Sequence, residues 1–268
     1  MTSGVSRGGP PEPNRRRSIT IGALSVDAVT RSEALEAIEA LVNAGHGGAV
    51  FTPNVDHIVL AEDDQRMRAA YARANLSLAD GVPVVWASRL MGEALPEKIS
   101  GSDLVTPLLD LASDRGWTVY FLGGAPGVAA LARDKLRDSL PRLRVVGVDS
   151  PRIDVDDSRE AREPILERIR SAHPDLVLVA LGAPKQEIWI DLVRDHLKPA
   201  VLFGVGASLD FVAGTLPRAP KWMSEAGLEW LFRLAREPRR LWRRYLLRDP
   251  KFALIVARGL WIRATPRL

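Results

Sequence analysis

An acidic side chain at the end of an apolar stretch is the first candidate for chemistry in this chain of 268 residues. Asp80 follows Leu76–Ala79 and precedes Gly81. A carboxylate at a strand end is partly desolvated, which raises its pKa towards the value that a general base needs. A turn aspartate before a flexible glycine is the other interpretation, and the abundance of Asp-Gly turns favours it when position alone is considered.

Two glycine pairs could bring backbone N–H groups to a phosphate. Gly123-Gly124 joins an apolar run to a helical pattern that begins near Pro126, and a helix N-terminus favours an anion. Gly204-Val205-Gly206 follows another apolar run, but Leu209 stands where a G-x-G-x-x-G dinucleotide fingerprint needs its third glycine. A nicotinamide-dependent oxidoreductase is therefore weakly supported, and a simple tight turn explains each pair equally well.

Two further segments carry polar groups just after apolar runs: Thr52-Pro53-Asn54, and the stretch from Gly182 to Glu187. Gln186 and Glu187 open a helical pattern, where an amide and a carboxylate could bind a nucleobase or sugar hydroxyls. Glu187 could equally be a first-turn acid that complements the helix dipole.

No pattern indicates a metal site. Asp154-Val155-Asp156-Asp157 has the form of a D-x-D metal motif, but a helical pattern starts near Ser158 and Asp is a favoured helix cap. The four histidines show no ligand spacing, and the chain has no cysteine, which fits a reducing cytoplasm. We expect neither a metal nor another cofactor.

The elements that would position these segments are short apolar runs alternating with helical patterns. This alternation predicts an α/β, Rossmann-like and mostly parallel sheet with helices on both faces, over residues 18–215. Ligands bind such sheets at the carboxyl ends of the strands, where the segments above converge. The expected strands are Ser18–Ile21, Ala49–Thr52, Leu76–Ala79, Trp117–Leu122, Arg144–Val148, Leu176–Leu181 and Ala200–Phe203. The expected helices include Arg31–Val42, Asp103–Arg115, Gly127–Leu140, Ser158–Ala172 and Lys185–His196.

The C-terminal part has a different pattern. Three helical segments, Lys221–Arg236, Pro238–Leu247 and Pro250–Ile262, follow without a strand and are separated by prolines. They predict an α-helical appendage over residues 216–268. Residues 1–17 contain prolines and an arginine run but no apolar segment of a signal peptide, so we expect a disordered basic leader.

The charge of the chain is unevenly distributed. Residues 218–268 hold thirteen Lys or Arg and four acids, a net +9, whereas the whole chain carries +4 and the rest therefore −5. Four of the seven tryptophans also lie there. A cationic, Trp-containing tail on an acidic body predicts binding to an anionic membrane surface, and no apolar stretch is long enough to span a bilayer. The acidic body and the lack of a recognition motif argue against a nucleic-acid partner.

In their order, these segments resemble the WecG/TagA/CpsF family of glycosyltransferases. The likeness covers about residues 18–248 and includes Ile99–Leu104 and Glu237–Tyr245. It implies metal-independent, inverting transfer of a sugar from a UDP-sugar to a polyprenyl-diphosphate-linked acceptor, in the synthesis of teichoic acid or surface polysaccharide. The sugar of the best-known members is N-acetylmannosamine, while other relatives transfer glucose or uronic acids.

The resemblance also implies roles for particular residues. Asp80 is the expected catalytic base and Thr52 an active-site partner. The tail is expected to attach to the inner face of the plasma membrane and to place arginines over the nucleotide; a homo-oligomer is left open. The expected substrate-binding residues are Asn54, Gly81, Gly123, Gly124, Gly182, Gln186, Glu187 and Gly206 in the body, and Arg233, Arg240 and Arg243 in the tail.

Overall fold

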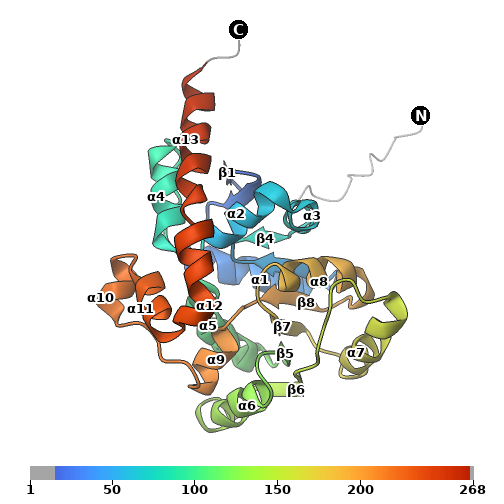
Figure 1. Cartoon of the computed structure of the whole chain (residues 1–268). Coiled ribbons are helices and arrows are strands. Elements are labelled where there is room, and N and C mark those ends of the chain that lie inside the picture. Colours follow the sequence, from blue (N-terminus) through green and yellow to red (C-terminus); the bar gives the residue numbers. More distant parts are fainter. Residues whose placement is uncertain (1–15, 266–268) are drawn as a thin grey trace, which may run out of the picture.

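A six-stranded parallel sheet forms the centre of the structure, a computed structural model that describes residues 16–265 (Figure 1). The strand order is β4-β3-β8-β7-β5-β6. Five of these strands are buried along their whole length, as expected where helices cover both faces. The predicted α/β fold is confirmed. The strands are β3 (Gly48–Phe51), β4 (Leu76–Ser77), β5 (Thr118–Gly123), β6 (Arg144–Asp149), β7 (Leu176–Ala180) and β8 (Val201–Gly204).

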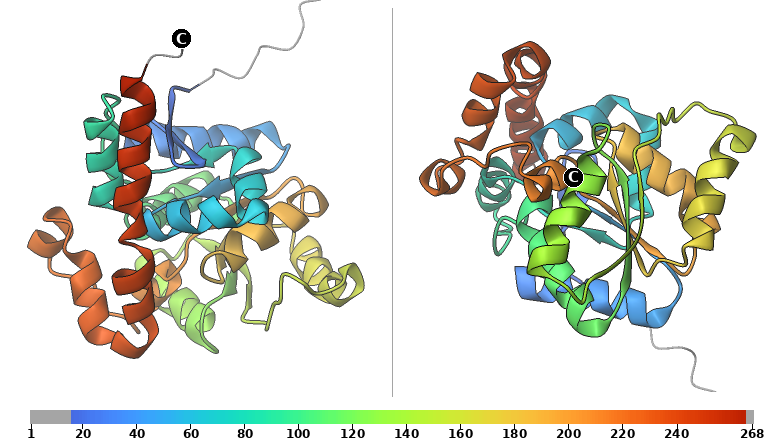
Figure 2. Two further views of the ribbon diagram at one scale, coloured as in Figure 1. Left: turned by 45° about the horizontal axis from the view of Figure 1, so that its top comes forward. Right: turned by 90° about the horizontal axis from the view of Figure 1, so that it is seen from below.

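Helices cover both faces of the sheet and enclose two hydrophobic cores (Figure 2). Phe121 and Phe203 lie in one core and Phe51 and Trp189 in the other. The first core lies under α1 (Arg31–Ala44), α5 (Gly101–Arg115), α6 (Val128–Ser139) and α9 (Ser208–Ala213). The second lies under α2 (Val55–Asp63), α3 (Gln65–Ala72), α7 (Arg159–Ser171) and α8 (Lys185–Val193), which ends in the 3-10 turn η1 (Arg194–His196).

The expected strand Ser18–Ile21 does not belong to the parallel sheet. It is β1, which pairs antiparallel with β2 (Leu24–Asp27) in a separate hairpin. Its side chains alternate between exposed and buried, which is typical of a strand with one solvated face. Gly22 turns the hairpin at φ 61°, and a Cβ there would lie 2.9 Å from Ile255. The predicted bounds of this strand are confirmed, and only its expected place in the parallel sheet was wrong, because an alternating strand buries one face and not both.

The C-terminal part is helical as predicted, but it is divided differently. The expected helix Lys221–Arg236 is broken at Gly227, which has φ 73° and where a Cβ would lie 3.2 Å from Val82. The expected helix Pro238–Leu247 changes to a π-helical turn after Arg243. The elements are α10 (Lys221–Glu225), α11 (Glu229–Arg236), α12 (Pro238–Arg243), the π-helical turn η2 (Arg244–Arg248) and α13 (Lys251–Ala264).

Helix α13 packs against the body of the molecule. It contacts α2 and β1 and lies beside α4 (Val82–Leu90), a helix outside the predicted ranges (Figures 1 and 2). Arg258 pairs with Glu62 of α2 at 2.5 Å, and Ile255 is buried in the core beneath it. Within residues 16–265, no helix has the length and apolarity needed to cross a membrane. The predicted leader lies almost entirely outside the described residues.

Candidate active site

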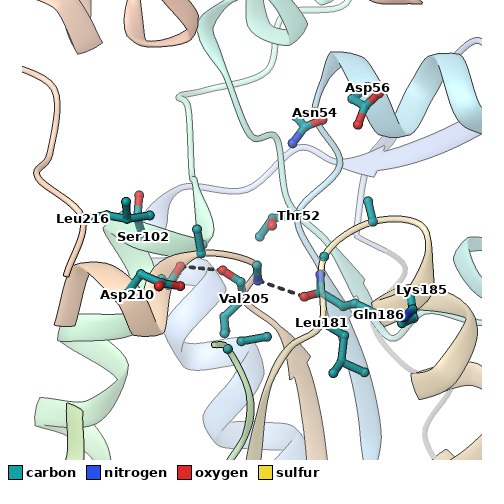
Figure 3. A pocket seen from close by; sticks show the side chains of 18 of the residues that line it. Thr52, Asn54, Asp56, Ser102, Leu181, Lys185, Gln186, Val205, Asp210 and Leu216 are labelled. Atoms are coloured by element: carbon teal, nitrogen blue, oxygen red, sulfur yellow. Dashed lines mark hydrogen bonds between the residues drawn. The ribbon is translucent and has the colours of Figure 1, made fainter. Parts of the chain in front are cut away.

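The loops at the carboxyl ends of the sheet line a cavity of about 690 Å³, which we call the polar cavity (Figure 3). Parallel strands end at the same edge, so loops distant in sequence meet there. Thr52 follows β3 and Asp80 follows β4, and both line this cavity. So do Gly124, Gly182 and Gly206, after β5, β7 and β8.

Asp80 is a half-buried carboxyl group whose pKa is raised to about 7. Burial is the main cause, and the negative charge of Glu229 adds to it. The positive charge of Lys98 opposes the rise, as does the side chain of Asn54. The backbone N–H of Asp80 donates to the carbonyl of Pro53 at 2.9 Å, which ties this loop to the one after β3. Near neutral pH this carboxylate can take up and release a proton, as a general base must.

Thr52 and Asn54 come from the loop between β3 and α2. Thr52 is buried among the residues that line the polar cavity. Asn54 caps α2, because its Oδ1 accepts a hydrogen bond from the backbone N–H of His57 at 3.3 Å. The same oxygen accepts from Arg244 Nη2 at 3.2 Å. Asn54 therefore links the sheet edge to the C-terminal helices.

The glycines have different structural roles. Gly182 and Gly206 adopt positive φ with open space where a Cβ would stand, so a ligand can approach their backbone. Gly123 is packed instead: its Cβ would lie 2.5 Å from the carbonyl oxygen of Ala180, and it does not line the polar cavity. The N–H of Gly124 donates to that same carbonyl at 2.8 Å. This hydrogen bond argues against Gly124 as a phosphate-binding N–H donor.

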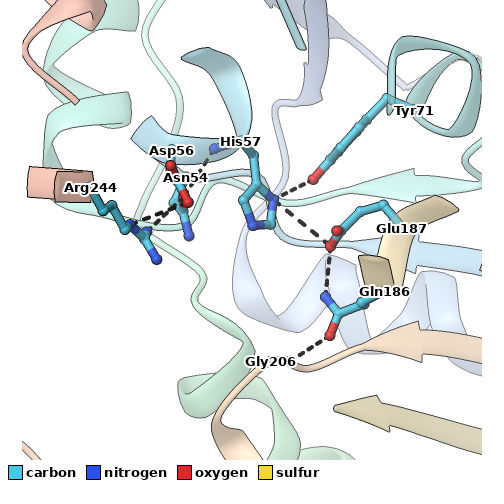
Figure 4. Close-up of polar contacts among 8 residues, drawn as sticks. All are labelled: Asn54, Asp56, His57, Tyr71, Gln186, Glu187, Gly206 and Arg244. Atoms are coloured by element: carbon cyan, nitrogen blue, oxygen red, sulfur yellow. Dashed lines mark hydrogen bonds and ion pairs between the residues drawn. The ribbon is translucent and has the colours of Figure 1, made fainter. Parts of the chain in front are cut away.

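Gln186 and Glu187 belong to a buried polar network behind the cavity (Figure 4). Gln186 Oε1 accepts from the backbone N–H of Gly206 at 2.9 Å, and its Nε2 donates to Glu187 Oε1 at 2.7 Å. Glu187 Oε1 also lies 3.9 Å from His57 Nδ1, which hydrogen-bonds the Tyr71 hydroxyl at 2.7 Å. Gln186 lines the polar cavity, whereas Glu187 is fully buried and does not.

The network is built from groups whose charged forms are disfavoured by burial. Burial raises the pKa of Glu187 to about 7 and that of Tyr71 well above its usual value. Burial, helped by the charges of Arg244 and Arg248, lowers the pKa of His57 to about 3. A neutral imidazole and a protonatable carboxyl can share hydrogen bonds without an unpaired buried charge. Through Gln186 Oε1, the network holds the backbone N–H of Gly206 at the wall of the cavity.

The tail arginines that line the polar cavity are not the same set as the expected ones. Arg233 and Arg240 line it as expected. Arg243 is exposed, stacks on Trp242 at 5.3 Å and does not line it. Arg244 and Arg248 line it instead: they stand four and eight residues after Arg240, about one and two helical turns, and so face the same side.

One acid holds these two arginines in place. Asp56 is only 3% exposed, and its carboxylate oxygens lie 3.3 Å from Arg244 Nε and 2.7 Å from Arg248 Nε. Sequence reasoning missed it, although it stands two residues after Asn54, at the start of a helix. The signal that could have indicated Asp56 is an acidic residue at the start of a helix in a chain whose tail is rich in arginine.

The D-x-D segment lies elsewhere. Asp156 is exposed and pairs with Arg66 at 2.5 Å, and Asp157 Oδ2 accepts from the backbone N–H of Asp154. The helix cap is Ser158, not an aspartate. Within residues 16–265, no three His, Asp or Glu side chains are grouped as metal ligands would be.

Comparison with known proteins identifies the family. The sequence profile of the glycosyl transferase WecG/TagA/CpsF family matches residues 19–266. The chain belongs to this family. It is 35% identical over 210 residues to a protein of Bacillus spizizenii named N-acetylglucosaminyldiphosphoundecaprenol N-acetyl-beta-D-mannosaminyltransferase, covering 78% of this chain and 79% of that one. A protein of Bacillus subtilis with the same name is 32% identical over the same shares of both chains.

The protein is therefore a glycosyltransferase, as the resemblance predicted. The family match extends through α13, beyond the limit near residue 248 that the motifs suggested. The helical tail is thus part of the family's shared sequence. That agrees with its contribution of Arg233, Arg240 and Arg244 to the polar cavity.

Proposed function

We propose that this glycosyltransferase transfers N-acetylmannosamine from its UDP derivative to N-acetylglucosamine carried on a polyprenyl diphosphate. The observation that carries the proposal is Asp80, a carboxyl group with a pKa of about 7, in a cavity that arginines also line. The relatives from Bacillus, named for this transfer, support the choice of sugar and acceptor.

In the proposed reaction, the Asp80 carboxylate accepts the proton of the acceptor hydroxyl. The hydroxyl oxygen then forms a bond to the anomeric carbon, from the face opposite UDP. The bond from that carbon to the diphosphate oxygen breaks, UDP leaves with the electron pair, and the anomeric configuration is inverted. A positioned base contributes about 10²–10⁴-fold to the rate of such a step.

Negative charge develops on the diphosphate as it leaves. We propose that Arg233, Arg240 and Arg244 stabilise it, since guanidinium groups bind phosphate oxygens in pairs. Three cations around one cavity supply charge of the kind that a divalent ion supplies elsewhere, so the proposed reaction is metal-independent. Thr52 and Asn54 are proposed to orient the sugar beside Asp80.

The acceptor class places the reaction at a membrane. We propose that the chain acts as a peripheral protein on the inner face of the plasma membrane, held there by its tail, residues 216–268. Trp222 and Trp261 are among the most exposed apolar side chains of the described residues, and both belong to that basic tail. Tryptophan and arginine together suit the interface between lipid headgroups and water.

The donor is tested by thermal unfolding in the presence of UDP-N-acetylmannosamine, UDP-N-acetylglucosamine, UDP-glucose, a UDP-uronic acid and NADH. A ligand that binds the folded state raises the unfolding temperature. We expect the UDP compounds to do so and NADH not to. Transfer to a lipid-linked N-acetylglucosamine, followed by mass analysis of the product with and without EDTA, then identifies the sugar. If UDP-glucose is the only donor that gives a product, the transferred sugar is glucose and not N-acetylmannosamine. Loss of turnover in EDTA would contradict metal independence.

A further inference from the structure

A second cavity, of about 390 Å³, opens beside Asp80 between the body and the C-terminal helices. We call it the apolar cavity, because most of its wall is hydrocarbon. Val82 and Pro83 of α4 form one side. Trp230 of α11 and Phe252 and Ala253 of α13 form the other.

The two cavities meet at the catalytic carboxyl group. Five residues line both of them: Asn54, Asp80, Glu229, Arg233 and Arg244. Asp80 is therefore accessible from both cavities. This arrangement suits a reaction between two substrates, because the base must touch the acceptor hydroxyl while the leaving diphosphate of the donor lies in line behind the anomeric carbon.

Charged side chains of both signs line the apolar cavity. Three are basic, Lys98, Arg233 and Arg244, and three are acidic, Asp80, Glu229 and Asp249. Lys98 Nζ lies 2.9 Å from Asp103 Oδ2 and 3.4 Å from Ser224 Oγ, so it is held at the junction between the body and α10. Guanidinium and ammonium groups beside a mostly hydrocarbon wall fit a ligand with an anionic head and an apolar chain.

The outer part of the apolar cavity borders an exposed apolar surface on α4. Gly227 lines the cavity, and a Cβ there would lie 3.6 Å from the Trp86 ring. Trp86 is 50% exposed, and Leu90, one turn later on α4, is 68% exposed.

Helix α13 continues this surface. It lies beside α4, where a Cβ at Gly259 would lie 2.9 Å from Met91 and Arg263 donates to the Met91 carbonyl (Figures 1 and 2). Its Leu254 and Trp261 are 72% and 67% exposed. A chain leaving the cavity thus passes between two helices that present apolar side chains to the surroundings, with basic residues close by. That combination suits an anionic lipid surface.

We propose that the apolar cavity binds the diphosphate and the first isoprene units of the polyprenyl-linked acceptor, while the polar cavity holds the nucleotide sugar. This inference rests on the proposed function for the identity of the acceptor. The lipid chain lies between α4 and α13, its diphosphate faces Lys98 and Arg244, and the sugar hydroxyl reaches Asp80 at the junction. Helix α4, which directly follows Asp80 and Gly81, thereby belongs to the acceptor site.

The test uses a change that fills the apolar cavity. Ala253 lines it and is exposed, so Ala253→Trp places an indole there with little cost to folding. Ala257→Trp is the matched control, because Ala257 lies one turn further along α13, is exposed and does not line the cavity. Binding of farnesyl diphosphate, farnesol and inorganic diphosphate to the full chain is measured by calorimetry, with unfolding temperatures recorded for each variant.

Farnesyl diphosphate has three isoprene units and no sugar, so its binding does not depend on the sugar assignment. We expect Ala253→Trp to weaken it at least tenfold and Ala257→Trp to change it less than twofold, with diphosphate binding unchanged in both. Farnesol should bind the unaltered chain at least tenfold more weakly than farnesyl diphosphate. Equal affinity of the two variants for farnesyl diphosphate would overturn the inference. Equal affinity of the unaltered chain for farnesol and for farnesyl diphosphate would overturn it as well.

A transfer assay separates this inference from the proposed function. With a long polyprenyl acceptor, Ala253→Trp should raise KM at least tenfold, whereas an acceptor with a methyl group in place of the lipid should show no difference between the variants. Normal transfer with an unaffected KM would overturn the inference and leave the function standing. If Ala253→Trp selectively loses farnesyl diphosphate binding but the unaltered chain transfers no sugar, the inference stands and the proposed function is overturned.

Discussion

Among the individual residues, Asp80 combines the two properties that a catalytic base needs. It lies where two cavities meet, and its pKa of about 7 lets it hold a proton at one step and release it at the next. Burial produces that pKa at a cost to stability, since an ionised carboxylate is disfavoured where water is scarce. Lys98 limits this cost by opposing the rise in pKa.

Asp80→Asn removes the base and keeps the shape of the side chain. We expect kcat for sugar transfer to fall by about 10²–10⁴-fold while UDP binding changes less than threefold. Steady-state transfer assays and calorimetry with UDP measure the two quantities. A kcat within fivefold of the unaltered enzyme would rule out Asp80 as the base.

The pH dependence follows from the same pKa. Because the base must be ionised, kcat/KM should rise with pH and level off above about 7. Stability should move the other way: a carboxyl group with a raised folded pKa stabilises the fold at low pH, and this contribution is lost as pH rises from about 4, its usual pKa, to about 7. Asp80→Asn should therefore not lower the unfolding temperature at pH 8. A lower value there would show that the ionised carboxylate is stabilising.

Among the helices and strands, the π-helical turn η2 carries Arg244 and Arg248 to the polar cavity. Asp56 holds it through Arg244 and Arg248, in the same loop and helix that carry Thr52 and Asn54. The tail is therefore fixed to the sheet edge beside the polar cavity.

Asp56→Asn keeps the size of this side chain but removes the charge that pairs both arginines. Breaking a fully buried pair costs about 3–5 kcal/mol, and we expect about 2 kcal/mol here because Arg248 is more than a third exposed. Activity should fall at least tenfold as Arg244 loses its position. Chemical denaturation, transfer assays and hydrogen exchange over residues 238–264 measure these effects.

The matched control is Asp156→Asn, which breaks the exposed pair with Arg66. An exposed pair contributes about 0–1 kcal/mol, so stability and activity should stay close to those of the unaltered chain. If the two variants behave alike, Asp56 does not position the tail.

For the molecule as a whole, the apolar side chains on α13 should decide membrane binding. We expect Leu254→Glu combined with Trp261→Glu to reduce sedimentation with anionic vesicles at least tenfold, since both residues are highly exposed and basic residues lie nearby. The unfolding temperature should barely change, because neither side chain is buried. High salt should weaken binding of the unaltered chain.

Leu131→Glu combined with Leu192→Glu is the control for this experiment. Both residues are exposed apolar side chains of the body, on α6 and α8, away from the tail. Vesicle binding should persist in this variant. Equal loss in both double variants would show that general hydrophobicity, and not the α13 surface, drives the association.

The sheet, its approximate strands and the edge where Thr52, Asp80 and Gly206 meet were all predictable from the sequence. Local patterns suffice for this, because apolar runs that alternate with helical patterns are typical of a covered parallel sheet, and such a sheet brings all its strand ends to one edge. The order of the motifs also indicated the family. Alternation along Ser18–Ile21 would have indicated the hairpin as well.

Which side chains of the tail face the site depends on the tertiary structure. Helical periodicity places Arg244 and Arg248 on the same side as Arg240, but it does not show which side faces the body; a buried partner, Asp56, determines where Arg244 and Arg248 point. The apolar cavity likewise exists only where α4, α11 and α13 come together. Contacts between segments about 170 residues apart depend on how helices pack, and local sequence patterns do not record that packing.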